Sequence, residues 1–410
     1  MNFARWIDDA RGFDRTVYAV LGARFINVIG TGVVYPYFTI HFFGNLGIPF
    51  TTVGLALFAN NIALALGTIF GGAFADKFGR KPVMVVSMAT SAITLAAYAW
   101  VNTASTLIAV ASMAGFTAGL YAPAAQAMLA DLTISSDREQ AFGLLKVASN
   151  VGFGSGFVIG GLLYGIARES IFIIDGITSG IVAVLLLVLL PRIHGGTAST
   201  LQDTIREWTR AISQPRLLWL ACLNVLFAIA YSQMQSTVPA FAEGQLGLSS
   251  GELGALYVIN PLTVVFFQLP AVSWVESWRR TRALIFSTGF WAMSFGAILL
   301  AHIGSNLVGV VLIGAFLFLR TMGENLHSPL ITSLTSDMAD METRGSQLSL
   351  LEVAKRIGFG IGPVIGGLFF DYGLEPYLWP TLILMCVVIA GGLLILEGSL
   401  STRENSGFSS

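Results

Sequence analysis

The chain has 410 residues, of which 55% are hydrophobic and only 11% are charged, and its net charge is −1. A soluble domain carries about 25% charged residues, so this composition excludes a soluble globular protein. No basic stripe is present, which argues against nucleic-acid binding. The two cysteines, Cys222 and Cys386, lie inside apolar stretches, which argues against a disulfide framework or a thiolate metal site.

Apolar stretches of about twenty residues or more recur along the chain, each long enough to cross a hydrocarbon core of about 30 Å as a helix. A helix satisfies its own backbone groups, as the bilayer requires. The sequence therefore predicts an all-α membrane protein with twelve transmembrane helices. The predicted spans are 16–42, 51–75, 82–101, 106–132, 139–167, 171–190, 216–241, 253–275, 283–302, 307–336, 346–370 and 377–396.

Lysine and arginine are distributed unevenly between the two sets of loops. On one side we find only Arg168, whereas the loops after even-numbered spans hold Lys77, Arg80, Lys81, Arg138, Arg279, Arg280, Arg282 and Arg344. Positive residues accumulate in short cytoplasmic loops. The N-terminus has no apolar run before a cleavage site, so we expect no secretory signal. We expect a multi-pass protein of the cell inner membrane with both termini in the cytoplasm.

The longest polar interruption, residues 191–215, predicts a cytoplasmic linker between a six-helix bundle at 1–190 and a second bundle at 216–410. Apolar residues recur in this linker at helical spacing, which suits either a helix lying on the membrane surface or a simple tether. They are Leu201, Ile205, Trp208 and Ile212.

The two halves are repeats of each other. Residues 144–162 reappear at 350–368 with the same glycines, and the same offset of 206 residues pairs Asp131 with Asp337. Because six helices separate equivalent positions, the halves share one topology and are related by a pseudo-twofold axis along the membrane normal. A substrate is then expected between the halves, near the middle of the membrane.

A charged loop joins the second and third spans. It reads Gly72-Ala73-Phe74-Ala75-Asp76-Lys77-Phe78-Gly79-Arg80-Lys81-Pro82. In physical terms Gly72 allows close helix approach, Gly79 allows a tight turn, and Asp76 can pair with Arg80. Lys77 and Lys81 are explained by topology alone.

This loop resembles the signature loop of the major facilitator superfamily, and with the spans and the repeat the resemblance covers essentially the whole chain. It implies the major facilitator fold and a transporter that works by alternating access without a cofactor. It also implies a charge relay of Asp76, Arg80 and Asp131, flanked by Arg138, with a partial counterpart in Asp337 and Arg344. The second-half loop, residues 276–280, has lost the glycine turn, so the relay is expected to act mainly from the first half.

The fifth and eleventh spans carry glycines at every fourth position, which lets neighbouring helix backbones approach. The fifth span also resembles the signature of the drug/proton antiporter branch, but Phe157 stands where that signature has proline. The proline occurs instead in the eleventh span, as Pro363. This departure keeps import of a metabolite open beside export.

Arg320 and Glu324 lie close to the middle of the tenth span. A charge there costs about 2.5–3.5 kcal/mol on insertion scales, so such residues normally face a cavity or a partner. Four residues apart, they share one helix face and can pair. We predict Glu324 as the proton-coupling carboxylate and Arg320 as its partner. Asp175, in the sixth span, is a second candidate, for which a structural bond is an equal alternative.

The remaining cavity residues are expected on the first, fourth, seventh and tenth spans, although each can instead serve helix packing. A mainly apolar cavity suits amphipathic or aromatic ligands. The candidates are Arg24, Asn27, Tyr35, Phe38, Tyr121, Gln126, Tyr231, Gln233, Gln235 and Asn325. His327 is expected to be a structural histidine rather than a proton relay.

Together these patterns favour a proton-coupled exporter of hydrophobic or amphipathic small molecules. A proton symporter or facilitator for a metabolite or lipid stays open, and a transport-like sensor is a remote alternative. We expect no enzyme, because the four histidines are scattered and no activated nucleophile is recognisable. The expected partners are a small-molecule substrate, protons and lipid, with no metal, no cofactor and no nucleic acid, and the expected state is a monomer.

Overall fold

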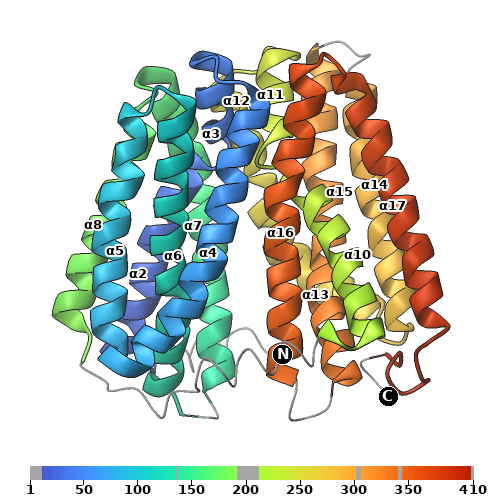
Figure 1. The fold of residues 1–410 in the computed structure, drawn as a ribbon, viewed down its shortest axis with the longest axis horizontal. Coiled ribbons are helices and arrows are strands. Elements are labelled where there is room, and N and C mark those ends of the chain that lie inside the picture. Colours follow the sequence, from blue (N-terminus) through green and yellow to red (C-terminus); the bar gives the residue numbers. More distant parts are fainter. Residues whose placement is uncertain (1–11, 135–136, 192–211, 302–305, 340–343, 408–410) are drawn as a thin grey trace. The chain divides into compact units, whose positions relative to one another are not determined.

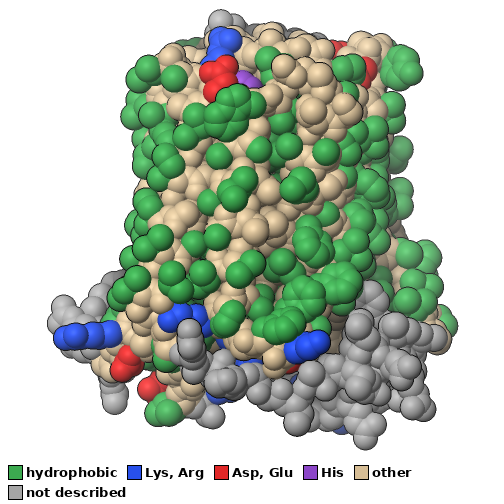
Figure 2. Space-filling model, turned by 60° about the vertical axis from the view of Figure 1, so that its left-hand side comes forward, with side chains coloured by type: hydrophobic (Ala, Val, Ile, Leu, Met, Phe, Trp, Pro, Cys, Tyr) green, Lys and Arg blue, Asp and Glu red, His purple; other side chains and the backbone are tan. Residues whose placement is uncertain are grey.

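The computed structural model describes residues 12–134, 137–191, 212–301, 306–339 and 344–407. Within these ranges the regular structure is helical throughout. Twelve helices are long and apolar enough to cross a membrane, which confirms the predicted number. On the face that Figure 2 presents, hydrophobic side chains cover the middle and charged side chains gather at the two ends. Of the linker residues proposed to form a surface helix, Leu201, Ile205 and Trp208 lie outside the described residues.

The chain forms two compact units (Figure 1). Unit 1 comprises Met1–Tyr35 and Ile62–Ala198, and unit 2 comprises Pro36–Asn61 and Ser199–Ser410. The units therefore do not coincide with the two sequence halves, because a segment of the first half is grouped with the second. Helix α4 (Phe50–Phe78) begins in unit 2 and ends in unit 1.

In unit 1, helix α2 packs against α7 and α8, and α5 packs against α6 and α8 (Figure 1). The glycines explain the close approach of α2 and α7, because a Cβ on Gly156 would lie 2.8 Å from Cα of Gly32. Besides the later part of α4, the elements are α2 (Arg15–Val34), α5 (Arg80–Ala97), η2 (Tyr98–Trp100), α6 (Ala104–Leu132), α7 (Arg138–Ile166) and α8 (Ser170–Leu189).

In unit 2, α14 packs against α15 and α17, α10 against α16 and α17, and α13 against α15. Its elements besides the start of α4 are α3 (Tyr37–Thr39), η1 (Ile40–Asn45), α10 (Pro215–Ser232), α11 (Thr237–Gly244), α12 (Ser250–Tyr257), α13 (Ile259–Trp274), α14 (Arg280–Ala301), α15 (Asn306–Met338), α16 (Arg344–Asp371) and α17 (Glu375–Glu397).

Three spans that the sequence predicts as continuous helices are interrupted. The first ends at Val34, the seventh divides into α10 and α11, and the eighth divides into α12 and α13. A proline follows each interruption within a few residues: Pro36, Pro239 and Pro261. Proline has no N–H to donate, and its ring clashes with the carbonyl four residues earlier, so regular α-helical hydrogen bonding is interrupted near each of these prolines.

The start of α4 is bound to the end of α16 inside unit 2. Both carboxylate oxygens of Asp371 accept hydrogen bonds, each 2.8 Å long, from the backbone N–H groups of Phe50 and Thr51. The first N–H groups of a helix have no partner within the helix, and a carboxylate also complements the helix dipole. A Cβ on Gly367 would lie 2.6 Å from the Thr51 nitrogen, so only glycine allows this approach.

Candidate functional site

Two charged residues in the middle of α15, Arg320 and Glu324, form an ion pair in unit 2. Nη1 of Arg320 donates to Oε2 of Glu324 at 2.6 Å, and the Tyr231 hydroxyl of α10 donates to the other carboxylate oxygen. Cζ of Arg320 lies 3.7 Å from the centroid of the Tyr231 ring. The arginine side chain is 1% exposed and that of Glu324 is 24% exposed. The predicted pair is therefore present, and Tyr231 bridges it to a second helix.

Glu324 reaches a pocket of about 150 Å³ within unit 2. Aromatic side chains from four helices form much of its wall, and the charged ends of Glu352 and Lys355 contribute from α16. A pocket that combines aromatic side chains with several polar and charged groups suits amphipathic ligands. The lining residues are Asn224, Phe227, Ala228, Tyr231, Trp291, Glu324, His327, Ser328, Ile331, Thr332, Leu348, Leu351, Glu352, Lys355 and Phe359.

Trp291 of α14 fixes the aromatic wall behind the carboxylate. Its ring centroid lies 5.5 Å from that of Phe227 and 5.9 Å from that of Tyr231. The indole occupies the space beside Gly323, because a Cβ there would lie only 1.9 Å from its Cδ1 atom. The residue next to Glu324 must therefore be small, or the indole that supports Tyr231 is displaced.

His327 forms part of the same wall. Its ring centroid lies 4.1 Å from that of Phe227 and 6.0 Å from that of Trp291, and the residue is 9% exposed. The structural role expected for this histidine stays a prediction, since His327 also lines the pocket beside Glu324.

A second charged cluster at the pocket was not recognised in the sequence. Glu352 accepts from Lys355 at 3.2 Å and from Arg356 at 3.0 Å. The signal was available, because the three residues stand three and four positions apart and share one helix face. All three side chains are partly exposed, so this cluster is more accessible to solvent than the pair of Arg320 and Glu324.

Asp175 of α8, the other predicted proton-coupling acid, lies in unit 1 and is 4% exposed. No hydrogen-bond partner for its Oδ1 atom is found among the described residues. Helix α2 covers this oxygen, because a Cβ on Gly30 would lie 2.5 Å from it. The structure thus places the two candidate acids in different units and in different surroundings.

The predicted cavity residues of unit 1 have diverse surroundings. Nε of Arg24 donates to the Ser149 hydroxyl at 2.9 Å, which ties α2 to α7. The other side chains do not form one cluster in the described contacts: Asn27 contacts the Met88 sulfur at 3.8 Å, Tyr35 packs against Phe153 and Phe157, Tyr121 is buried, and Gln126 is exposed.

Two of the three amides predicted for the cavity in unit 2, those of Asn325 and Gln233, donate to backbone carbonyls. Asn325 donates to the Thr263 carbonyl of α13 at 3.2 Å, and Gln233 donates to the Ile229 and Gly362 carbonyls. The Gln235 carbonyl, which Pro239 leaves without a helical donor, accepts from the Thr39 hydroxyl at 3.4 Å. These contacts join helices of unit 2. Phe38 is buried and packs against Phe42.

The signature loop of unit 1 forms a continuous chain of charges. Arg80 pairs with Asp76 at 3.3 Å and also with Asp131 of α6. Gly79 has φ of +90°, in the left-handed region that favours glycine, and it precedes the first residue of α5. The expectation for Gly72 is wrong: a Cβ there would meet nothing within 4 Å, so close helix approach does not require this glycine.

Three basic residues of the same loops bind other groups. Lys81 donates to the Leu190 carbonyl at 2.6 Å at the end of α8, and Arg138 donates to the Ala130 carbonyl at 3.0 Å. Nζ of Lys77 lies 5.3 Å from the centroid of the Phe78 ring. Lys81 and Arg138 thus satisfy carbonyls at helix ends.

In unit 2 the partner of Asp337 is Arg280, the first residue of α14. The sequence had paired Asp337 with Arg344, so this expectation is corrected. The repeat offset aligns Arg344 with Arg138, whereas Arg280 occupies the position of Arg80 in the second-half loop. The loop alignment therefore predicts the ion pair of Asp337 correctly, and the offset of 206 residues does not. In each unit the arginine of the loop is the first residue of a helix, α5 or α14, that packs against the helix carrying the aspartate.

No metal centre is evident in the described part of the chain, where no three His, Cys, Asp or Glu side chains gather closely enough to hold an ion.

The sequence pattern that defines the Major Facilitator Superfamily matches residues 20–258 and 237–407. The chain belongs to this superfamily. Its similarity to the uncharacterized MFS-type transporter YttB of Bacillus subtilis is 26% identity over 399 residues, covering 96% of this chain and 98% of the relative. It is 27% identical over 362 residues to the multidrug resistance protein MdtH of Salmonella typhimurium, covering 87% of each chain.

The fold is also that of solved superfamily transporters. The crystal structure of the nucleoside transporter NupG aligns with a TM-score of 0.77 at 16% identity, covering 94% of this chain and 99% of that one. At this identity the likeness shows the fold alone. The superfamily member described here is thus a multi-pass membrane transport protein, with twelve candidate membrane-spanning helices in the described residues.

Proposed function

We propose that this superfamily member exports hydrophobic or amphipathic small molecules across the bacterial inner membrane in exchange for protons, and that Glu324 carries the proton. The observation that carries the proposal is that Glu324 is ion-paired to buried Arg320 and at the same time forms part of the wall of an aromatic pocket. The similarity to a multidrug resistance protein supports the same substrate class.

The contacts of Glu324 give a physical reason why a proton and a substrate would not bind to this carboxylate at the same time. A proton on Glu324 cancels the charge that Arg320 and Tyr231 bind, and so weakens the ion pair to the buried guanidinium. An uncompensated buried charge is costly, so protonation favours a rearrangement around α15. A cationic substrate group is attracted by the ionised carboxylate and repelled by the nearby arginine when Glu324 is protonated. Mutual exclusion of two ligands is what antiport requires.

The charged loop of unit 1 is proposed to take part in alternating access. Asp76, Arg80 and Asp131 join the end of α4, the start of α5 and α6 at one end of the unit. Because α4 extends from this relay into unit 2, a change in the relay can be transmitted along one continuous helix. By the distribution of Lys and Arg, we propose that this end faces the cytoplasm.

The experiment is substrate-driven proton movement in liposomes. Purified protein is reconstituted with a pH dye and an acid interior, and lipophilic cations and neutral aromatic compounds are added one at a time. A transported compound is expected to trigger loss of internal protons with wild type and with Glu169→Gln, an exposed acid at the start of α8. Glu324→Gln is expected to abolish the signal. Undiminished proton movement in Glu324→Gln would show that this carboxylate is not the carrier.

A proton symporter for a metabolite is the second candidate, because Phe157 stands at the position of the antiporter proline. Its ring packs against Tyr35 at 6.0 Å and Phe153 at 5.7 Å, inside unit 1. The sign of the same signal separates the two functions: a substrate added outside should drive protons out by exchange, whereas symport should carry protons inward with the substrate.

A further inference from the structure

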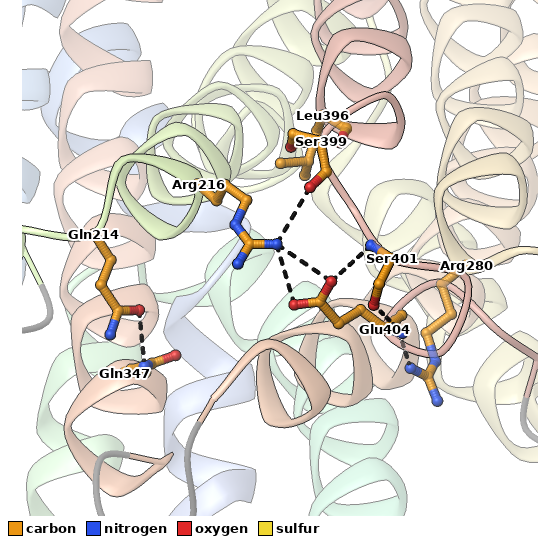
Figure 3. A network of polar contacts seen from close by, with 8 residues as sticks. All are labelled: Gln214, Arg216, Arg280, Gln347, Leu396, Ser399, Ser401 and Glu404. Carbon is orange, nitrogen blue, oxygen red and sulfur yellow. Dashed lines mark hydrogen bonds and ion pairs between the residues drawn. The ribbon is translucent and has the colours of Figure 1, made fainter.

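The C-terminal segment Ser399–Gly407 folds back onto the helix ends of unit 2 (Figure 3). Ser401 and Glu404 form a reciprocal turn, in which the Ser401 N–H donates to the Glu404 carboxylate at 2.7 Å and the Glu404 N–H donates to the Ser401 hydroxyl at 3.2 Å. This arrangement has the hydrogen bonds of a capping box. The sequence Ser-x-x-Glu at 401–404 therefore specifies a compact turn after α17.

Two helix starts are bound by this turn. Arg216, at the start of α10, donates to the Glu404 carboxylate at 3.1 Å and to the Ser399 carbonyl at 3.2 Å. Nη1 of Arg280, the first residue of α14, donates to the Glu404 carbonyl at 3.0 Å (Figure 3). The segment thus holds the ends of α10, α14 and α17 together.

Asn405 caps α14 from outside that helix. Its Oδ1 accepts from the Thr281 N–H at 3.0 Å, its Nδ2 donates to the Thr281 hydroxyl at 2.9 Å, and its carbonyl accepts from the Arg280 N–H. Asn405 is 5% exposed and Thr281 is fully buried. Asparagine is a preferred N-cap residue, and here it is supplied by a segment more than one hundred residues later in the chain.

The two units hold the arginine at the start of α5 and of α14 with different groups. In unit 1 the loop itself supplies Gly79 before α5 and Asp76 as a partner of Arg80. In unit 2 the corresponding loop has Arg279 before α14, and Arg280 obtains its second partner from the Glu404 carbonyl. In both units the arginine then pairs with an aspartate of a neighbouring helix.

We propose that Ser399–Gly407 is a positioning element that replaces, in the second repeat, the glycine turn of the signature loop and the bond that Asp76 makes to Arg80. By fixing Arg280 and the first turn of α14, it holds the ion pair of Arg280 with Asp337, which lies at the end of the helix that carries Glu324. The role in transport rests on the proposed function, whereas the positioning itself does not.

Hydrogen–deuterium exchange of the full-length protein tests the positioning without any substrate. Asn405→Ala is expected to speed exchange of the first turn of α14 and also of the last turns of α15, by roughly 2- to 30-fold, the range that loss of an N-cap gives. Arg403→Ala, a matched change at an exposed residue of the same turn, is expected to speed neither. In an Asp337→Asn background, Asn405→Ala should affect α14 but add nothing at α15.

Faster exchange confined to α14 would overturn the positioning role, because it would make Asn405 a local cap. If Asn405→Ala does not fold, Ser401→Ala weakens the same turn and is expected to give the same pattern with smaller changes. With a transported substrate, Asn405→Ala is expected to lower the maximal rate and leave the half-saturating concentration unchanged, since the segment does not line the pocket. Absent transport with an intact exchange pattern would refute the proposed function and not this inference.

Discussion

Unit 1 and unit 2 each bury an acid in a membrane helix, but they surround it differently. Asp175 is 4% exposed and its Oδ1 atom has no hydrogen-bond partner among the described residues, whereas the 24% exposed Glu324 side chain binds Arg320 and Tyr231 beside a pocket. A proton carrier needs both access and a partner whose contact changes with protonation. The difference teaches that two acids placed in membrane helices can differ in partners and in access, and under the proposed function these two properties single out Glu324.

The largest expected effect comes from removing each acid. Glu324→Ala removes the carboxylate that binds the buried guanidinium of Arg320, so we expect it to destabilise the protein by about 3 kcal/mol, at the low end for breaking a buried pair. Asp175→Asn replaces a carboxyl that has no ionic partner among the described residues, and it is expected to leave the free energy of unfolding unchanged or raised. Thermal unfolding in detergent measures both. Equal losses in the two variants would remove the distinction between the acids.

A smaller effect is expected from the glycine that faces each acid. A Cβ on Gly323 would lie 1.9 Å from the Trp291 ring, and one on Gly30 would lie 2.5 Å from the Asp175 carboxylate. Alanine at either position should cost about 1–3 kcal/mol through overpacking. Only Gly323→Ala is expected also to weaken binding of an aromatic substrate, because the indole supports Tyr231.

The control for these two substitutions is Gly314→Ala on α15. There a Cβ would lie 3.4 Å from Ile259, an ordinary contact. Since alanine favours a helix over glycine by about 1 kcal/mol, this variant should be neutral or stabilised. Tryptophan fluorescence quenching measures substrate binding, and thermal melting of the same samples measures stability, so the two effects can be separated. Weakened binding in Gly30→Ala would contradict the assignment of the pocket to unit 2.

Asp371 is a third acid, partnered by backbone rather than by a cation. Asp371→Asn keeps one acceptor but loses the charge at the start of α4, worth about 0.3–1 kcal/mol for a helix N-terminus. We expect exchange of the first-turn amides of α4 to accelerate by roughly 2- to 5-fold, with no change after Glu375→Gln at the start of α17. Unchanged exchange in Asp371→Asn would show that the carboxylate charge does not hold this contact.

The smallest effect concerns Glu404, outside the membrane-spanning helices. Partial burial raises the pKa of this carboxyl, but the bonds from Ser401 and the charge of Arg216 outweigh it, so the pKa is lowered from 4.5. A lowered pKa gives stability that is fully present above the unfolded-state value and is lost as the pH falls through the folded-state value. The melting difference between wild type and Glu404→Gln should be constant above about pH 5 and shrink toward about pH 3. A constant difference down to pH 3 would contradict this ionic role.

The sequence predicted what depends on local spacing. Twelve spans follow from runs of apolar residues, and the pair of Arg320 with Glu324 follows from a separation of four on a helix. The bond from Tyr231 could not be predicted, because it depends on the rotation of α10 about its axis. Asn325 and Gln233 resembled cavity residues, yet their amides satisfy backbone carbonyls where helices meet.

Contacts between segments far apart in the chain could not be predicted from residue spacing. Nothing in the sequence shows that Asp371 caps α4 or that Asn405 caps α14, since each bond joins residues more than one hundred positions apart. The same applies to Pro36–Asn61, which the repeat assigns to the first half and the structure groups with unit 2. The error at Gly72 has the same origin, because a small residue signals close approach only when a neighbouring helix is present.

The most direct test of the central claim compares two modes of transport in Glu324→Gln and Asp175→Asn. Each protein is reconstituted, and labelled substrate is followed both in exchange with unlabelled substrate and in accumulation driven by a pH gradient. We predict that Glu324→Gln retains exchange but loses accumulation, because only the latter requires the proton, and that Asp175→Asn retains both. Accumulation that persists in Glu324→Gln, or is lost in Asp175→Asn alone, would contradict the assignment of proton coupling to Glu324.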